Sequence, residues 1–413
     1  MPPPVFLIQL ATFTMNSIQL SSRVNRMQES ATLKMAQLSR DLTAQGNHVI
    51  NLSIGEPDFD TPVHIKEAAK KALDEGYTKY TPVPGLPELR QAIVDKFKQD
   101  NGLEYSLNQI VVSNGAKQSI ANLVLALVNE GDEVILFTPY WVSYKEIVKL
   151  GGGVPVALKA EITSDFKVSA EQLQQAINQK TKMIIFSSPC NPTGSVYTRS
   201  ELEQLSEVIA THPNIIVVSD EIYEYINFTD DHVSIGTFPA LKDRTVTVNG
   251  FSKGFAMTGW RLGYIGAPVW IAKACTKIQG QFTSGASSFG QKAAAYALQA
   301  SMDATDTMRT AFLHRRNMMI EILREIDGLQ VNVPQGAFYI FPNVSHFFGK
   351  SYGDHKVDNA DDLALYILHQ AHVGIVSGSA FGDDDCVRIS YAASEEELRE
   401  AVHRIEQALS LLA

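Results

Sequence analysis

Cysteine is scarce in this chain of 413 residues. Cys190, Cys275 and Cys386 lie far apart in the sequence, and no Cys-x-x-Cys pair occurs. Scattered cysteines in odd number indicate neither a disulfide framework nor a cysteine zinc site, so we expect no bound metal. A chain of this length can bury a core that is stable without such cross-links. We therefore expect the protein to work in a reducing compartment, and the cytoplasm is the simplest choice.

Long apolar runs and an excess of basic charge are also missing. No apolar run reaches the roughly 18 residues that a membrane-spanning helix requires. The net charge is -10, from 35 basic and 45 acidic residues, which argues against a nucleic-acid-binding surface. The N-terminal stretch MPPPVFLIQLATF has no basic region before its apolar part, so it does not match a signal peptide. We expect residues 1–14 to be a disordered leader, with Met15 as an alternative start.

The sequence does contain a series of short, β-rich apolar runs with helical patterns between them. They are IVVS (110–113), EVILF (133–137), MIIFSS (183–188), IIVVSD (215–220) and TVTVNG (245–250). The last three begin roughly 30 residues apart, the length of a strand–helix–strand unit. Their apolar residues are continuous rather than alternating, which is typical of strands covered on both faces. Residues 61–320 are thus predicted to form an α/β domain with a doubly wound, mostly parallel sheet.

The two ends of the chain have a different pattern. Residues 311–326 and 394–412 have helical spacing, 330–344 reads as strand, turn and strand, and 386–392 reads as a further strand. Residues 20–46 also have a helical pattern. We expect a smaller α+β domain built from both chain ends, with residues 1–60 and 321–413.

Polar and small residues follow several of the predicted strands. They are Gly115, Ala116 and Lys117 after the first, Trp141 after the second, Asn191 after the third, Asp220 and Tyr223 at the fourth, and Lys253 after the fifth. Taken singly, each of these residues has a structural explanation that needs no function, such as a turn, a core aromatic, a rigid loop or a helix cap. In open α/β sheets, however, ligands bind beyond the carboxyl ends of the strands, so these groups are predicted to share one rim.

Pyridoxal phosphate fits this set of groups. Its aldehyde requires a lysine amine, its ring nitrogen requires an anion, and its ring face favours aromatic stacking. Backbone N–H groups at a helix start and an arginine suit the phosphate. Metal binding does not require such a set, and the GxGxxG fingerprint of nicotinamide-binding folds is absent.

With these residues in place, the chain resembles the class I, fold-type I aminotransferases, and within them the bacterial subgroup of aspartate aminotransferases. The resemblance covers about residues 18 to 413 and rests on several motifs in one order. These motifs are LSIGEPDFDTP (52–62), TKYTPVPGLPELR (78–90), SNGAKQ (113–118), TPYWVSY (138–144), SSPCNPTG (187–194), SDEIYE (219–224), NGFSKGFAMTGWRLGY (249–264), QGAFYIF (335–341) and VRISYA (387–392).

The resemblance implies a role for each residue on the rim. Lys253 would form the Schiff base with the cofactor and shuttle the proton during transamination. Asp220 would pair with the pyridine nitrogen, while Asn191 and Tyr223 would bond the ring oxygen. Trp141 would stack on the ring.

The phosphate region and a subunit contact are implied in the same way. Gly115, Ala116, Lys117 and Arg261 would hold the phosphate. Many relatives carry a serine three residues before the lysine as a phosphate ligand; here that position is Gly250, and Ser252 is the candidate replacement. Tyr80 would reach the site of a neighbouring subunit, which implies a homodimer with shared active sites.

The substrates implied are amino acids and 2-oxo acids. Arg388 matches the arginine that grips the substrate α-carboxylate, and Gly55 the glycine that closes over the substrate. Lys117, Thr32 and a partner-subunit serine, Ser284 or Ser287, would bind a distal carboxylate. A distal cation selects dicarboxylates, which favours transfer of the amino group of L-aspartate to 2-oxoglutarate by a ping-pong mechanism.

Two alternatives stay open at this point. The protein could be another class I aminotransferase, acting on alanine, aromatic amino acids or prephenate. Prephenate use is associated with a basic residue at the position of Gln28, which lowers that expectation. The other alternative is a non-catalytic regulator that binds pyridoxal phosphate, but such proteins carry a separate DNA-binding domain and this chain is acidic. Lys117 could also only cap its helix in solvent.

Overall fold

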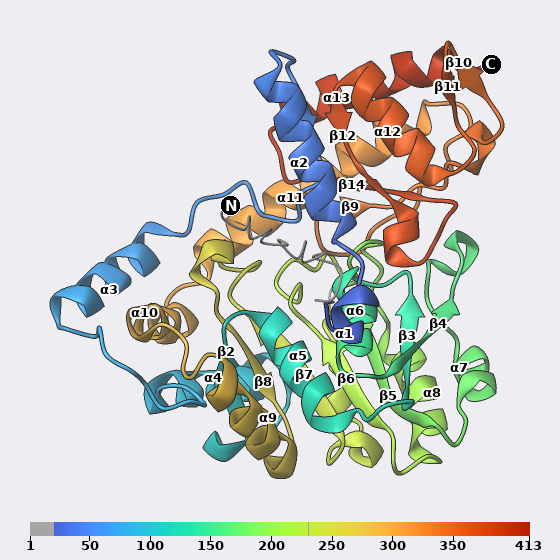
Figure 1. The fold of residues 1–413 in the computed structure, drawn as a ribbon. Helices are drawn as coiled ribbons and strands as arrows, with labels where there is room; N and C mark the ends of the chain where they lie inside the picture. The colour runs from blue at the N-terminus through green and yellow to red at the C-terminus, as the bar shows by residue number, and fades with distance from the viewer. Residues whose placement is uncertain (1–19, 230) are drawn as a thin grey trace, which may run out of the picture.

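The computed structural model describes residues 20–229 and 231–413 and divides them between a large lower unit and a smaller upper unit (Figure 1). The leader predicted for residues 1–14 and the alternative start at Met15 lie outside the described residues.

The large unit is built on a sheet whose seven described strands are mostly parallel, with β8 antiparallel to both of its neighbours. In spatial order they are β2 (Ile110–Ser113), β8 (Gly263–Gly266), β7 (Thr245–Gly250), β6 (Ile216–Asp220), β5 (Thr181–Ser187), β3 (Glu133–Thr138) and β4 (Val154–Lys159). The five strands that the apolar runs predicted are confirmed. The sequence did not single out β4 and β8.

Helices cover both faces of this sheet, as the continuous apolar runs predicted. Along β3, Val134 and Leu136 pack against α5, α6 and α9 on one face, while Ile135 and Phe137 pack against α7 and α8 on the other. A third cluster joins α3, α4 and α10 to β2 and β8. The bounds are α3 (Val63–Asp74), α4 (Pro87–Asn101), α5 (Ala116–Leu127), α6 (Ser143–Leu150), α7 (Ala170–Ala176), α8 (Arg199–Ala210), α9 (Val269–Phe282) and α10 (Ser288–Gln299).

The smaller unit combines the N-terminal segment with the C-terminal part of the chain, so that α2 lies beside elements from the other chain end (Figure 1). Its elements are α2 (Ala31–Ala44), β1 (Ile50–Asn51), α11 (Asp303–Arg324), β9 (Tyr339–Ile340), β10 (Ser351–Tyr352), β11 (His355–Lys356), α12 (Ala360–Ala371), β12 (Val373–Gly374), β13 (Val376–Ser377), β14 (Val387–Ser390) and α13 (Glu395–Ser410). Strands β13, β14 and β9 form an antiparallel sheet, and β1 pairs with β12 in parallel.

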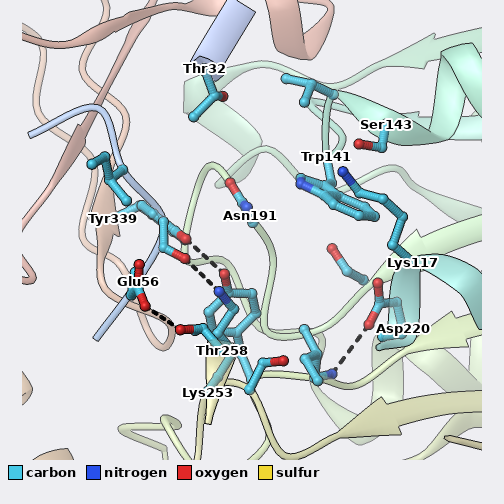
Figure 2. A pocket seen from close by; sticks show the side chains of 18 of the residues that line it. Thr32, Glu56, Lys117, Trp141, Ser143, Asn191, Asp220, Lys253, Thr258 and Tyr339 are labelled. Atoms are coloured by element: carbon cyan, nitrogen blue, oxygen red, sulfur yellow. Dashed lines mark hydrogen bonds between the residues drawn. The ribbon is translucent and has the colours of Figure 1, made fainter. Parts of the chain in front are cut away.

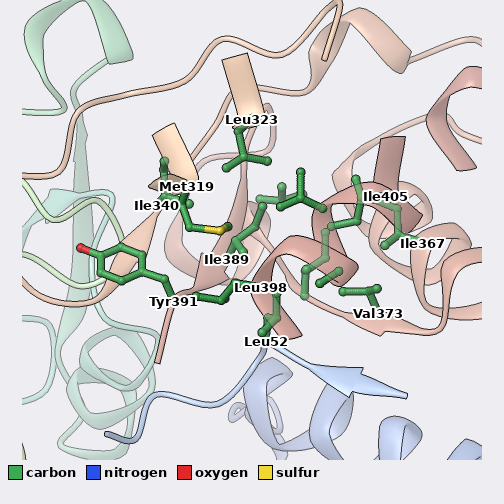
Figure 3. Packing of buried hydrophobic residues seen from close by; sticks show 14 of the residues in the cluster. Leu52, Met319, Leu323, Ile340, Ile367, Val373, Ile389, Tyr391, Leu398 and Ile405 are labelled. Atoms are coloured by element: carbon green, nitrogen blue, oxygen red, sulfur yellow. The ribbon is translucent and has the colours of Figure 1, made fainter. Parts of the chain in front are cut away.

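One apolar core holds this unit together. Leu52 from the N-terminal segment packs in the same cluster as Ile367, Val373 and Leu398 from the C-terminal part (Figure 3). Helix α13 begins with a capping box, in which Ser394 and Glu397 satisfy each other's backbone N–H groups, and it buries one apolar side against this core.

The proposed boundary between residues 320 and 321 falls inside α11. Met308 and Phe312, in the first half of this helix, already pack in the core of the smaller unit. The division of the chain into residues 61–320 and 321–413 remains a proposal. The packing of Met308 and Phe312 favours a boundary nearer the start of α11.

Two predicted elements differ from the structure. The helical pattern of residues 20–46 forms two helices, α1 (Ser22–Asn25) and α2, because residues between them contact the large unit: the Gln28 N–H donates to Glu146 Oε2 at 2.8 Å. In 330–344 only β9 is a strand. Asn332 instead donates to the Thr193 carbonyl at 2.7 Å, which holds the first half of this segment against the large unit.

None of the helices in the described part of the chain combines the length and apolar character needed to cross a membrane. Cys190, Cys275 and Cys386 are all free thiols.

A buried ionic cluster ties α4 to the segment that follows β6. Lys96 pairs with Glu224, and its Nζ also donates to Asn101 Oδ1 at 2.6 Å. Glu221 accepts from Ser234 at 2.6 Å, and His232 Nε2 lies 2.9 Å from the same carboxylate oxygen. The two glutamates and the histidine are of metal-ligand type and lie close together. The ammonium group of Lys96 already supplies a cation there.

Replacing Lys96 by methionine should lower the free energy of unfolding by about 3 kcal/mol, because Glu224 would keep a buried charge without its cation. Adding Glu224→Gln should recover most of that loss, since it removes the charge. Urea unfolding followed by circular dichroism measures both effects. The matched control is Lys292→Met, which breaks the more exposed Lys292–Glu88 pair and should cost no more than about 0.5 kcal/mol. Equal losses for the buried and the exposed lysine would contradict this account.

Candidate active site

A cavity of about 380 Å³ lies where strands of the large sheet end and the smaller unit begins (Figure 2). Strand β6 ends at Asp220, and its parallel neighbour β7 ends three residues before Lys253. Both side chains therefore lie at the same edge of the sheet and line the cavity. The smaller unit contributes Tyr339 from β9 and Arg388 from β14.

Most of the residues predicted from the sequence line this cavity. They are Thr32, Gly55, Ala116, Lys117, Trp141, Asn191, Asp220, Tyr223, Ser252, Lys253, Arg261 and Arg388. They come from both ends and the middle of the chain, and the fold brings them together.

Gly115 is not part of the lining but shapes it. It precedes the first residue of α5 with a φ of +83°, a conformation that favours glycine. A Cβ at this position would lie 2.5 Å from Arg261 Nη2. The missing side chain lets the Arg261 guanidinium approach the N-terminus of α5, where backbone N–H groups and the helix dipole favour an anion.

Tyr80, Ser284 and Ser287 are not brought to this cavity within the one chain. Tyr80 is 99% exposed and lines a separate hollow that Ser287 and Phe289 also line. Ser284 follows the end of α9.

The structure leaves little space for a side chain at Gly250. A Cβ on Gly250 would lie 2.9 Å from both the Gly263 Cα and the Leu262 carbonyl oxygen, so strand β8 leaves no room for a side chain. Ser252 is buried and lines the cavity, whereas Gly250 does not.

Lys253 contacts uncharged partners inside the cavity. Its Nζ donates to the Gly55 carbonyl at 2.5 Å and lies 5.8 Å from the ring centres of Tyr223 and Phe338. Burial lowers the pKa of this amine to about 8, and the charge of Arg388 acts in the same direction, although Glu56 opposes it. A larger fraction of this amine than of an ordinary lysine is therefore neutral near pH 7.5.

Asp220 is buried at the end of β6. The Tyr144 hydroxyl donates to its Oδ2 at 2.6 Å, and the Ile222 N–H donates to Oδ1 at 3.3 Å. Burial raises the pKa of Asp220 to about 6, and the Tyr144 hydrogen bond opposes that rise. A cation next to this carboxylate would favour its ionised form.

Arg388 is 2% exposed and carries a charge that no carboxylate of the described residues neutralises. Its Nη1 donates to Asn191 Oδ1 at 3.0 Å and its Nη2 to the Ser53 carbonyl at 2.6 Å. Its Nε is buried and has no hydrogen-bond partner in the described chain. A buried guanidinium with neutral partners and an unused donor is a strong site for an incoming carboxylate.

The charges of the cavity favour anions. Four cationic side chains line it, and the acidic ones are Asp220 and Glu56, the latter hydrogen-bonded to the Thr258 hydroxyl. The cations are Lys117, Lys253, Arg261 and Arg388. This excess of positive charge in an acidic chain matches a ligand set with a phosphate and carboxylates.

The same donor set fits pyridoxal phosphate. An amine of lowered pKa lies in the cavity with a buried carboxylate, and an indole ring lies at the wall with Lys117 Nζ 4.9 Å from its centre. Arg261 lies against the start of α5 at Gly115. Each part of the cofactor therefore has a group of matching chemistry among the residues present.

Several lining residues were not singled out from the sequence, among them Tyr144, Tyr339, Glu56 and Thr258. Each lies within a motif that was recognised. Tyr144 ends TPYWVSY, for example, and Tyr339 is in QGAFYIF. The motifs were therefore the available signal, but they did not indicate which further members face the cavity.

Comparisons with known proteins agree with this geometry. The chain is 49% identical to the Petunia hybrida "bifunctional aspartate aminotransferase and glutamate/aspartate-prephenate aminotransferase", over 95% of this chain and 83% of that protein. It is 45% identical to the aspartate aminotransferase of Geobacillus stearothermophilus, over 94% of this chain and 98% of that one.

Solved structures share the fold over nearly the whole chain, which bears out the predicted fold class. The aspartate aminotransferase of Rhizobium meliloti has a TM-score of 0.93 and 42% identity, covering 96% of this chain and all of that one. That of Thermus thermophilus with maleate has a TM-score of 0.89 and 39% identity, covering 95% of this chain and all of that one. The family model described as aminotransferase class I and II matches residues 47–405, and the chain belongs to this family.

Proposed function

We propose that this protein is an aspartate transaminase that depends on pyridoxal phosphate. It transfers the amino group of L-aspartate to 2-oxoglutarate, giving oxaloacetate and L-glutamate in two ping-pong half-reactions. The observation that carries the proposal is the amine of Lys253, with a pKa lowered to about 8, in one cavity with buried Asp220 and an unneutralised Arg388. Relatives and solved structures named aspartate aminotransferase support it.

Pyridoxal phosphate, when bound, supplies an aldehyde that links to amines and a ring that accepts the electron pair left at the substrate Cα. Lys253 would hold the aldehyde, Asp220 the charged ring nitrogen, and Trp141 the ring face. Asn191 and Tyr223 would donate to the ring oxygen. Arg261, Ser252 and the start of α5 at Gly115, Ala116 and Lys117 would hold the phosphate.

Once substrate replaces it, the Lys253 amine is free to move a proton at the substrate Cα. A general base works best when its pKa lies near the working pH, and burial brings this amine into that range. The Gly55 carbonyl accepts from the amine at 2.5 Å and would keep it in place between transfers.

The α-carboxylate of the substrate would bind Arg388. The guanidinium is fixed by Asn191 and Ser53, which leaves its unused donor for a carboxylate. A bidentate contact of this kind also fixes which bond of the Cα faces the ring. Gly55 would close over the bound substrate.

A distal carboxylate would bind Lys117, with Thr32 beside it. Both line the cavity, and Lys117 has no carboxylate partner in the described chain. Maleate, named with the Thermus thermophilus structure, is a dicarboxylate, which supports a site for two carboxylates in this family.

We further propose a homodimer in which each subunit completes the other's site. The full exposure of the Tyr80 ring supports this, because an aromatic side chain in water gains little unless it is later covered. Tyr80 would contact the partner's phosphate region, and Ser284 or Ser287 the distal carboxylate. We assign the enzyme to the cytoplasm on the basis of its free thiols.

Prephenate is a second candidate amino acceptor. The Petunia hybrida relative and the Cereibacter sphaeroides relative both carry prephenate in their names. Gln28 replaces the expected basic residue, but it lines a second hollow next to the cavity, together with Lys117 and Lys145. Steady-state rates with prephenate, aromatic 2-oxo acids, pyruvate and 2-oxoglutarate as acceptors separate these candidates.

Lys253→Ala should abolish covalent attachment of the cofactor and lower kcat by about 10⁴-fold, because both the attachment point and the proton carrier are lost. Absorbance of the purified protein and a coupled aspartate assay measure the two effects. The exposed Lys242→Ala is the matched control and should behave as the unchanged protein. Full turnover by Lys253→Ala would contradict the proposal, and cofactor binding by the unchanged protein with no half-reaction would favour a regulator instead.

Lys117→Ala should lower kcat/KM for aspartate by about 100-fold while changing that for alanine little, because alanine has no distal carboxylate. Steady-state rates with both amino donors measure the preference. A similar loss for both donors, with weaker cofactor binding, would assign Lys117 to the phosphate alone. An unchanged preference for aspartate would show that the lysine only caps its helix.

The rate at which the cofactor attaches to the cofactor-free protein should depend on pH through Lys253. The neutral amine is the reactive form, so the rate should rise about tenfold per pH unit at low pH and level off near pH 8, where the lowered pKa lies. Stopped-flow absorbance after mixing with pyridoxal phosphate measures it. A rate that is still rising at pH 10, as for an ordinary lysine, would show that the amine is not desolvated.

A further inference from the structure

Tyr339 lies in the cavity but has no role in the function proposed above. It belongs to β9 of the smaller unit and is completely buried, and Figure 2 shows it among the side chains of the cavity. Its hydroxyl contacts Tyr223 and its ring contacts Arg388, two residues to which that function gives roles. The hydroxyl lies 2.7 Å from the Tyr223 hydroxyl, and the ring centre lies 4.5 Å from the Arg388 guanidinium carbon.

The two hydroxyl groups form a short chain of hydrogen bonds. Each is the other's side-chain partner, and either can be the donor. When Tyr223 donates its proton to an anionic oxygen in the cavity, its own oxygen is left to accept, and Tyr339 is placed to donate to it. Consecutive hydrogen bonds polarise one another, so Tyr223 becomes a stronger donor when Tyr339 donates to it.

Arg388 favours this direction of donation. Burial raises the pKa of Tyr339, but the adjacent positive charge of Arg388 opposes that rise. Burial also raises the pKa of Tyr223, the nearby Tyr339 raises it further, and Arg388 opposes the rise there as well. The guanidinium lies over the Tyr339 ring, 4.5 Å from its centre, and this placement of the charge favours Tyr339 as the donor of the pair.

The ring of Tyr339 fixes the guanidinium from one side. Phe381 lies on Arg388 as well, with its ring centre 4.9 Å from the guanidinium carbon. Aromatic faces attract a cation, and the attraction is larger where water is excluded. The two rings set the plane of the guanidinium, while the Asn191 and Ser53 oxygens set its rotation within that plane.

Gly55 packs closely against the Tyr339 hydroxyl. A Cβ at Gly55 would lie 2.5 Å from the Tyr339 hydroxyl oxygen, so any side chain there would displace it. The carbonyl of the same glycine accepts from Lys253. Tyr339 thus contacts three groups between the two units of the fold. They are Gly55, whose carbonyl accepts from the Lys253 amine, the Tyr223 phenol and the Arg388 guanidinium.

We infer that Tyr339 is a positioning residue with two separable actions. Its hydroxyl strengthens the hydrogen bond that Tyr223 donates to the cofactor's ring oxygen, and its ring orients Arg388 toward the substrate carboxylate. The inference rests on the proposed function, because it concerns the cofactor and the substrate named there.

Tyr339→Phe isolates the action of the hydroxyl. The ring and its packing remain, but Tyr223 loses its donor and holds negative charge on the ring oxygen less well. The pH at which the absorbance of the bound cofactor changes should therefore rise by about 0.5 unit. KM for aspartate should change less than about twofold, since the ring still faces Arg388. A spectrophotometric pH titration of the loaded protein without substrate gives the first result, and steady-state kinetics gives the second.

Tyr339→Leu removes the ring as well. KM should then rise about tenfold for aspartate and for alanine alike, because Arg388 would bind the carboxylate that both share. A rise for aspartate alone would overturn the action assigned to the ring. If the leucine variant does not fold, the phenylalanine variant still tests the hydroxyl.

Tyr391→Phe is the matched control. Tyr391 is also completely buried in the smaller unit, and its hydroxyl donates to the Ala337 carbonyl at 3.1 Å, but it does not line the cavity. It should lose stability as any buried tyrosine would, without moving the absorbance midpoint. An equal shift in both variants, or none in Tyr339→Phe, would overturn the inference while leaving the proposed function intact. An unchanged protein that takes up no pyridoxal phosphate would overturn both.

Discussion

Arg388 carries a buried positive charge, and no carboxylate of the described chain forms an ion pair with it. Burying such a charge costs free energy that other contacts in the fold must offset. Its neutral partners and the aromatic rings at its faces reduce the cost without removing it. An anion that enters the cavity would neutralise this charge and gain the free energy that its burial costs. The unneutralised charge that destabilises the fold therefore favours anion binding.

The same physical principle applies to the other ionisable groups of the site. Burial lowers the pKa of Lys253 and raises that of Asp220, in each case favouring the neutral form. A ligand with a cationic ring nitrogen and anionic substituents would reverse the balance at Asp220 and supply the missing charges. The cavity is therefore complete electrostatically only when it is loaded, which is expected of a site that acts through an acquired cofactor.

The fold provides the rigidity that this arrangement needs. Asp220 and Lys253 follow neighbouring strands of a sheet that is covered on both faces, and Arg388 lies in a strand of the second unit. The two units meet at the site through contacts between side chains, such as the Tyr223 and Tyr339 hydroxyls. The buried pair of Lys96 and Glu224 anchors the segment that follows Asp220 to helix α4.

Sequence by itself determined five strands of the large sheet, the fold class and about half of the residues that line the cavity. Strand-forming apolar runs are local, and residues directly after parallel strands must share one edge of a sheet, so Asp220 and Lys253 could be placed together in advance. Only the tertiary structure decided that β8 closes the space at Gly250, that the helical pattern of residues 20–46 breaks at Gln28, and that Tyr144 and Tyr339 face the site. Those outcomes depend on which side chains from distant segments meet, and local pattern carries no information about such contacts because they are set by packing across the whole fold.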